Sequence, residues 1–154
     1  MTERIPEHRP PAPGVPLVHL EIVTPLGLAH KDDVDEVIVP AARGELGVQP
    51  LHRPLLAALA AGSVRWRHGT EWEEAVVGPG FLEVGPDRVS LLAEKFLDQD
   101  AIDVAAAQAE LAAADQALLV FDGEPGGARQ AELGRERAWA AARVDVGSRR
   151  RLEI

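Results

Sequence analysis

The feature that most constrains the fold is an abrupt change of sequence pattern near residue 97. From Leu17 to that point, short apolar runs alternate with turn residues, a pattern typical of β-strands. Beyond it, residues 102–121 contain neither glycine nor proline, which is typical of a helix. The chain therefore divides into a strand-rich part followed by a helical part.

Turn residues in the strand-rich part are spaced as an antiparallel arrangement requires. Hairpin turns are predicted at residues 68–70, 78–80 and 85–87. Val64 and Trp66 alternate with arginines, so that strand has one apolar and one charged face. The pattern predicts an antiparallel β-sandwich, a flattened barrel resembling a jelly roll.

The helical part is predicted to be a hairpin of two arms. Asp100 and Asp103 resemble a capping pair that opens the first helix. The sequence GEPGG at residues 123–127 must end that arm, and a second helix is expected over about 128–144. The fold class is therefore an N-terminal β-sandwich followed by a C-terminal α-helical hairpin.

The two predicted arms differ in charge and are rich in alanine. Residues 98–128 carry seven acidic and no basic side chains, whereas residues 129–154 carry seven arginines against four acids. The arms should attract each other. The expected facing residues are Ala105, Ala109, Ala112 and Ala113 against Ala131, Gly134, Ala138 and Ala142. Alanine buries little surface, so the hairpin is expected to be weakly held.

Composition and pattern give four segments. They are a proline-rich leader at 1–15, the sandwich at 16–97, the hairpin at 98–146 and a basic tail at 147–154, whose arginines are most simply a solvated end. The net charge of −9 argues against a nucleic-acid partner, and no cysteine is present. No apolar run is long enough to cross a bilayer, so a soluble, unexported chain is expected.

Few residues in the chain indicate chemistry of their own. His52 has no nearby nucleophile, and His19, His30 and His68 lack the spacing of a metal site. No phosphate-binding glycine loop with Lys-Ser or Lys-Thr occurs. The chain is therefore expected to have no catalytic residue, no metal and no cofactor.

One segment, GELGVQPLHRPLLAALAAGSVR at residues 44–65, is more distinctive. Its two early glycines allow tight turns, its prolines stiffen the loop and its leucines supply apolar side chains. The segment resembles the signature of the epsilon subunit of F-type ATP synthases, a Gly-Glu-Leu-Gly turn followed by a Pro-Gly-His-x-Pro-Leu-Leu loop. The flanking sequences LEIVTPLG, VVGPGFLEVGPDRVSLLAE and IDVAAAQAEL extend the resemblance over about residues 18–144.

The resemblance implies a non-catalytic rotor subunit that joins the gamma subunit to the membrane c-ring. The implied c-ring docking loop comprises Gly44, Glu45, Leu46, Gly47, Pro50, His52, Pro54, Leu55 and Leu56. It also implies that the hairpin inhibits ATP hydrolysis by contacting beta and alpha subunits, for which the candidate residues are Arg135, Arg137 and Arg143. The expected location is peripheral, on the cytoplasmic face of a bacterial plasma membrane.

The chain departs from the family pattern at informative positions. Leu51 stands where the family usually has glycine. In the family's ATP-binding pattern Ile102, Asp103 and Arg137 match, but three arginine places are occupied by Ala106, Ala113 and Ala141. Because guanidinium groups pair with phosphates, ATP is expected to bind poorly.

Two alternatives stay open at this point. One is the epsilon subunit of an alternative ion-translocating F-type enzyme. The other is a free-standing jelly-roll enzyme or sugar-binding module that ends in helices. Co-purification of a gamma subunit would distinguish a synthase subunit from the free-standing module.

Overall fold

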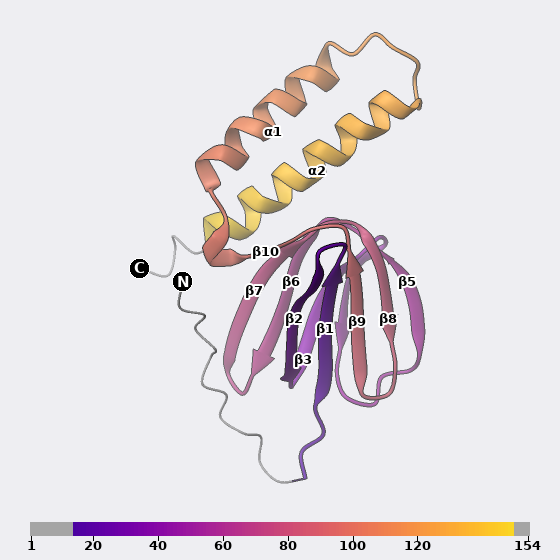
Figure 1. The fold of residues 1–154 in the computed structure, drawn as a ribbon, viewed down its shortest axis with the longest axis vertical. Helices are drawn as coiled ribbons and strands as arrows, with labels where there is room; N and C mark the ends of the chain where they lie inside the picture. Colours follow the sequence, from indigo (N-terminus) through magenta and orange to yellow (C-terminus); the bar gives the residue numbers. More distant parts are fainter. Residues whose placement is uncertain (1–13, 150–154) are drawn as a thin grey trace.

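The computed structural model describes residues 14–149, with ten strands, one short 3-10 helix and two α-helices. The strands are β1 (Val18–Thr24), β2 (Gly27–Val34), β3 (Glu36–Ala41), β4 (Gly44–Val48), β5 (Leu55–Leu59), β6 (Gly62–His68), β7 (Glu71–Val77), β8 (Gly80–Val84), β9 (Arg88–Ala93) and β10 (Phe96–Asp98). The helices are η1 (Gln99–Ala101), α1 (Val104–Leu119) and α2 (Ala128–Arg149). Figure 1 shows the two α-helices together at one end of the strands.

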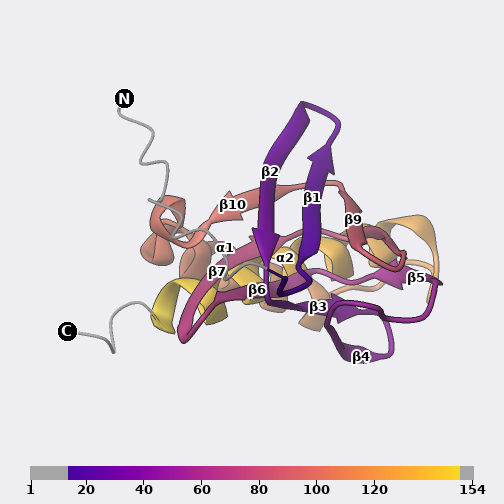
Figure 2. The ribbon, with the colours of Figure 1, turned by 90° about the horizontal axis from the view of Figure 1, so that it is seen from below.

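The strands form one continuous sheet that folds over itself into a nearly closed sandwich. Their order is β10-β7-β6-β3-β5-β8-β9-β1-β2, and β4 pairs with β3 beside this path. Neighbouring strands are antiparallel except β1 and β9, which pair in parallel. Figure 2 shows the β1–β2 hairpin rising from the rest of the sandwich. The predicted sandwich followed by a helical hairpin is confirmed.

Two of the three predicted hairpin turns are confirmed and one is wrong. Residues 68–70 join β6 to β7, and residues 85–87 join β8 to β9. Residues 78–80 instead carry the chain between β7 and β8, which do not pair with each other. Gly80 lies so close to β9 that a Cβ atom there would be 1.8 Å from the carbonyl oxygen of Leu92. The glycine therefore serves a close strand contact rather than a hairpin turn.

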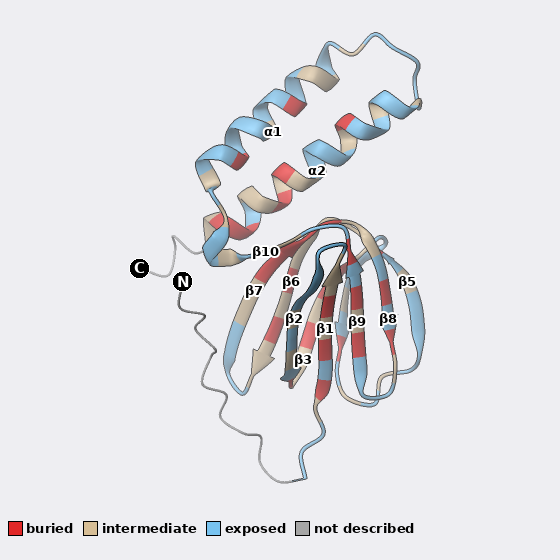
Figure 3. Cartoon of the chain, viewed as in Figure 1, coloured by how far each residue is buried: buried red, intermediate tan, exposed pale blue. Residues whose placement is uncertain are grey.

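The core of the sandwich is aliphatic. Val64 and Trp66 of β6 point inward, as their alternation predicts, and their side chains are buried. Around them lie Val18, Leu20, Ile22, Val34, Val37, Val39, Leu82 and Leu91, all buried. Figure 3 shows the buried positions alternating along the strands. This period of two is what a strand with one face on the core requires.

The helical hairpin rests on the sandwich through α2. A second apolar cluster joins Val76 of β7 to Ala142 and Val146 of α2, with Leu97, Ile102 and Trp139 packed against it. Helix α1 packs mainly on α2 and lies farther from the strands (Figure 1). One helix therefore connects the two parts of the molecule.

The predicted inner face of α1 is wrong. Ala105, Ala109, Ala112 and Ala113 are exposed, whereas the inward positions are Val104, Ala107, Leu111, Ala114 and Leu118. These follow the i, i+3, i+4 spacing of a single helical face. The larger side chains decide the rotation because they bury more apolar area than alanine. On α2, Ala131 and Ala138 are exposed, and Ala142 packs toward the sandwich.

The second helix is longer than the sequence pattern indicates, ending at Arg149 rather than near Val144. Its last turns are held by packing, since Gly147 is buried against the side chains of Ile102 and Val104. Arg149 therefore belongs to a helix rather than to a solvated tail. The leader up to residue 13, and Arg150 and Arg151, lie outside the described residues.

Candidate functional site

The segment that resembles the family signature forms β4, the loop at 49–54 and β5. The backbone N–H of Leu51 in this loop donates to the carbonyl oxygen of Pro86, 2.8 Å away in the β8–β9 turn. That turn lies at the end of the sandwich opposite the helices (Figure 1). The loop at 49–54 and the hairpin therefore occupy opposite ends of the molecule, whereas Gly44 and Glu45 lie at the other end of β4, level with Leu59 and Gly80 at the end nearer the helices.

The two glycines of the signature play different roles. Gly44 has φ of +126° where the chain turns from β3 into β4, a conformation that favours glycine. Gly47 lies within β4 opposite Ile38, with no positive φ. The expectation that both glycines form tight turns is thus confirmed for Gly44 and wrong for Gly47.

Leu51 has φ of +66°, and it is the one non-glycine residue with positive φ among residues 14–149. This is the position where the family pattern usually has glycine. The loop has therefore kept a left-handed conformation although its residue carries a Cβ atom, which costs about 1–2 kcal/mol. The Leu51 side chain is 78% exposed, so burial does not offset that cost.

Glu45 is exposed on β4, and its carboxylate accepts from the guanidinium of Arg65 at 3.2 Å. Leu46, in contrast, packs against the sandwich core. His52 is half-buried, and its Nδ1 lies 2.7 Å from the carbonyl oxygen of Arg53. Leu46 therefore has a structural role, while Glu45 is available at the surface.

The remaining loop positions form a largely exposed apolar surface. Leu55 and Leu56 are exposed, as is Pro54, while Pro50 is half-buried. Leu56 has 73% of its surface accessible. Together with Leu51, these side chains present apolar area that the sandwich does not use for its own core.

A second exposed apolar surface, which the sequence analysis missed, crosses five strands. Its members face outward and are neighbours in register across β5, β8, β9, β1 and β2: Ala58, Phe81, Leu92, Val23 and Leu28. We call this set the apolar row. Phe81, Leu92 and Leu28 are 61%, 53% and 60% exposed. Apolar residues beside buried ones, as in Phe81-Leu82 and Leu91-Leu92, are the sequence signal that could have revealed it.

The apolar row differs from the outward row next to it. That row contains Leu56, Glu83, Ser90, Glu21 and Lys31. At the β2 end, the apolar row continues into a cleft of about 560 Å³ between the β1–β2 turn and Trp139 of α2. A large exposed apolar patch on a folded domain indicates a contact with another molecule.

Two of the three candidate regulatory arginines pair with α1 in this structure. Arg137 Nε donates to Asp115 at 2.5 Å, and Arg143 forms an ion pair with Glu110 while its guanidinium lies over the Trp139 ring. These contacts confirm that the oppositely charged arms attract. Arg135 is exposed.

The residues that match the family's ATP pattern have structural partners here. Asp103 caps α1 by accepting from the backbone N–H of Ala106 at 3.0 Å. Ile102 packs in the cluster between the hairpin and the sandwich. Arg137 is engaged by Asp115, and poor ATP binding stays a prediction.

The end of the hairpin is attached to the sandwich by charge. Arg149 Nε donates to both carboxylate oxygens of Glu74 on β7, at 2.9 and 3.1 Å. Glu74 also accepts from Ser63 Oγ at 2.6 Å, and it is only 12% exposed. The hydrogen bond to Glu74 raises the pKa of Arg149 above its ordinary value.

Of the three histidines without metal spacing in the sequence, two come together in the fold. His30 and His68 both approach the carboxylate of Asp32, whereas His19 pairs with Asp33 on the exposed side of the β1–β2 hairpin.

Among the residues from 14 to 149, no helix is both long and apolar enough to cross a membrane.

Known proteins resemble the chain in sequence. Residues 17–111 match the family model for the β-sandwich domain of the ATP synthase delta/epsilon chain. The ATP synthase epsilon chain of Halalkalibacterium halodurans is 38% identical over 135 residues, covering 88% of this chain and 100% of that relative. The epsilon chain of Alkalihalophilus pseudofirmus is 43% identical over 101 residues, covering 66% and 76%.

Solved structures show the same fold at low identity. A chain of the Euglena gracilis mitochondrial ATP synthase, from a structure of OSCP, F1 and c-ring, matches with a TM-score of 0.71 at 17% identity, covering 85% of this chain and 82% of that one. A chain of the Tetrahymena thermophila mitochondrial ATP synthase, from a structure of the central stalk and c-ring, matches with a TM-score of 0.57 at 14% identity. The match covers 86% of this chain and 95% of that one. With the matched family model and one relative matched over its full length, this chain belongs to the epsilon subunits of F-type ATP synthases, which are non-catalytic subunits of that complex.

Proposed function

We propose that this chain joins the gamma subunit to the c-ring in the central stalk, and that its helical hairpin restrains ATP hydrolysis. The observation that carries the proposal is the presence of two separate exposed apolar surfaces on a sandwich whose core is already complete. One is the apolar row, and the other is the loop at 49–54 together with Leu55 and Leu56 at the start of β5. A subunit that connects two partners needs two such surfaces.

The apolar row is the proposed contact for gamma. Phe81 and Leu92 lie side by side at its centre and are more than half exposed. A few side chains near the centre of an interface typically cost more than about 1 kcal/mol each when they are truncated. Phe81→Ser should therefore weaken co-purification of gamma, whereas Glu83→Ser, two residues along the same outward face of β8, should not. Equal retention of gamma by both variants would remove this assignment.

The loop is the proposed contact for the c-ring, together with Glu45 at the other end of β4. Glu45→Ala together with Leu56→Ser should reduce proton pumping and membrane binding of the reconstituted enzyme. Leu56 is the better choice than Leu46, because Leu46 packs on the core and its loss would also destabilise the sandwich. Wild-type pumping by this double variant, alongside an unchanged Glu71→Ala control, would contradict the docking role.

The hairpin is the proposed inhibitory element. In the docked arrangement its positive arm pairs internally, so Arg137 and Arg143 reach another subunit only after leaving Asp115 and Glu110. The Arg137–Asp115 pair is about half exposed, and such pairs contribute little, about 0–1 kcal/mol, so exchange of this partner costs little free energy. The acceptor we propose is an acidic segment of the catalytic beta subunits.

Deleting residues 101–154 should raise the ATPase activity of the assembled enzyme and leave gamma bound. Arg135→Glu with Arg137→Glu should give part of that rise. Equal ATPase rates of full-length and truncated assemblies at low ionic strength, where screening is least, would show that the hairpin is inert. In this role the chain works at the cytoplasmic face of a bacterial plasma membrane, held there through the complex.

A further inference from the structure

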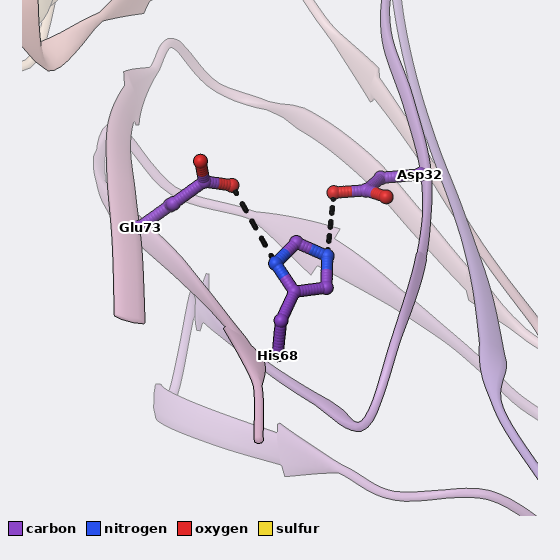
Figure 4. Close-up of side chains that lie close together, drawn as sticks. All are labelled: Asp32, His68 and Glu73. Carbon is purple, nitrogen blue, oxygen red and sulfur yellow. Dashed lines mark ion pairs between the residues drawn. The ribbon is translucent and has the colours of Figure 1, made fainter. Parts of the chain in front are cut away.

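A group of ionisable side chains lies where the two ends of the sheet meet. Strand β2 ends the strand order on one side, and β7 and β6 lie near its other end. Asp32 comes from β2, His68 from the end of β6 and Glu73 from β7. One ligand atom from each lies within 4.8 Å of the others, and Figure 4 shows the His68 ring between the two carboxylates.

Two histidine side chains approach the same carboxylate oxygen of Asp32. His68 Nε2 lies 2.9 Å from Asp32 Oδ2, and His68 Nδ1 lies 3.8 Å from Glu73 Oε2. His30 Nε2 lies 3.7 Å from the same Asp32 oxygen. Two imidazole nitrogens thus approach one carboxylate oxygen, and the Asp32 side chain is only 8% exposed.

His30 has an unusual environment for a structural histidine. Its ring packs against Trp66, with centroids 4.4 Å apart, and against Phe96 at 6.2 Å. Its Nε2 atom is buried and makes no hydrogen bond in the described part of the chain. A buried polar nitrogen without a hydrogen bond is costly and calls for an explanation.

The spacing of these atoms suits a metal ion. Zinc binds histidine nitrogen and carboxylate oxygen at about 2.0–2.2 Å in tetrahedral geometry, which places neighbouring ligand atoms about 3.3 Å apart. The two observed separations, 2.9 and 3.7 Å, lie on either side of that value. Both histidine nitrogens therefore lie at distances from the Asp32 oxygen close to those between neighbouring ligands of one ion.

We propose that His30 Nε2, His68 Nε2 and Asp32 bind one divalent transition-metal ion of the zinc class. Glu73 then accepts a hydrogen bond from His68 Nδ1–H and orients the ring, as outer carboxylates do at other zinc sites. Trp66 Nε1–H in turn donates to Glu73 Oε2 at 2.5 Å and positions that carboxylate. Because imidazole suits zinc, whereas calcium and magnesium prefer oxygen ligands, two histidine ligands should favour zinc over calcium or magnesium.

A further carboxyl group, that of Asp98, lies near the site. Asp98 on β10 is close enough to His30 and Glu73 for their charges to act on it. Partial burial raises the pKa of Asp98, attraction to His30 lowers it, and repulsion from Asp100 and Glu73 raises it. A bound ion would join β2 to β6 across the seam of the sandwich, so its expected effect is on stability.

The test uses the isolated full-length subunit and Zn²⁺ as the probe. The chain has five histidines, of which three serve as controls: His8, His19 and His52. Calorimetry should show one Zn²⁺ bound by the wild type and by the triple variant His8→Gln, His19→Gln, His52→Gln. His30→Gln with His68→Gln should weaken binding at least 100-fold, and Glu73→Gln about 10–100-fold.

A carboxylate pair gives a second matched control. Asp32→Asn should abolish binding, whereas Asp33→Asn, on the same strand and beside His19, should not. Zn²⁺ should also raise the thermal unfolding midpoint of the wild type and of the triple variant. Absence of saturable Zn²⁺ binding by the wild type, or loss of binding in the triple variant, would overturn the proposal. The triple variant retains both proposed histidines, so this outcome does not depend on whether the site variants fold.

Discussion

Replacing Gly147 with alanine should loosen the helical hairpin, because α1 begins directly against this position. A Cβ atom at Gly147 would lie 2.6 Å from Val104 Cγ2 and 2.9 Å from Ile102 Cγ2. Both neighbours are β-branched, so their side chains have little freedom to rotate away. The start of α1 must therefore shift.

Gly147→Ala changes the free energy of hairpin docking by two opposing effects, overpacking and a gain in helix propensity. Overpacking a well-packed site costs about 1–3 kcal/mol. Alanine in place of glycine inside a helix contributes about 1 kcal/mol in the other direction. The net effect on docking of the hairpin is a loss of about 0–2 kcal/mol.

Gly134→Ala is the matched control within the same helix. Nothing lies within 4 Å of a Cβ atom built at Gly134, so this substitution should give only the gain in helix propensity. The two variants should therefore differ by about 1–3 kcal/mol, and each 1.4 kcal/mol is about tenfold in the opening equilibrium. Their separation does not depend on the absolute stability of the subunit.

Native-state hydrogen exchange of the α1 amides measures this opening directly. Gly147→Ala should speed exchange in α1 relative to the wild type or leave it near the wild-type rate, and Gly134→Ala should slow it. Equal slowing by both substitutions would refute the reasoning, because it would mean that α1 does not rest on Gly147.

Three further predictions follow from single contacts. In urea unfolding, Leu51→Gly should be about 1 kcal/mol more stable than Leu51→Ala, because only glycine adopts the positive φ without strain. Equal unfolding midpoints of the two variants would show that Leu51 is not strained. Glu74→Gln should weaken docking of the hairpin by about 1–2 kcal/mol, because its charge-assisted hydrogen bonds to Arg149 are lost. Glu132→Gln is the control: its ion pair with Arg129 is exposed, so stability should change by less than about 0.5 kcal/mol. Similar rates of hydrogen exchange in α2 of both variants would contradict this prediction. Calorimetry should detect no micromolar ATP binding by the purified subunit, since Ala106, Ala113 and Ala141 supply no guanidinium; tight binding would reverse that inference.

The local sequence pattern predicted individual strands and helices of this protein well. The alternation of Val64 and Trp66 with arginines indicated a strand with one buried face, and the structure confirms it. The absence of glycine and proline over residues 102–121 indicated a helix, and Asp103 caps it. These features depend on neighbours in sequence, so periodicity and capping chemistry are enough to predict them.

Contacts between distant segments could not be predicted in this way. The sequence pattern did not indicate which face of α1 is buried, because alanines occur all around that helix and a few larger side chains decide its rotation. It also placed a hairpin at residues 78–80, where the chain instead moves between strands that do not pair. In both cases the outcome depends on packing against residues far away in the sequence.

The sequence by itself thus determined the order and type of the elements, and through the segment at 44–65 the family. Tertiary structure alone decided that Arg149 meets Glu74, 75 residues earlier, and that His30 and His68 meet at Asp32. The physical reason is that backbone periodicity depends on local side chains, whereas charge pairs and ligand groups depend on how the folded elements pack. When a site forms where the two ends of a sheet meet, its residues have no characteristic spacing in the sequence, and the sequence therefore does not predict the site.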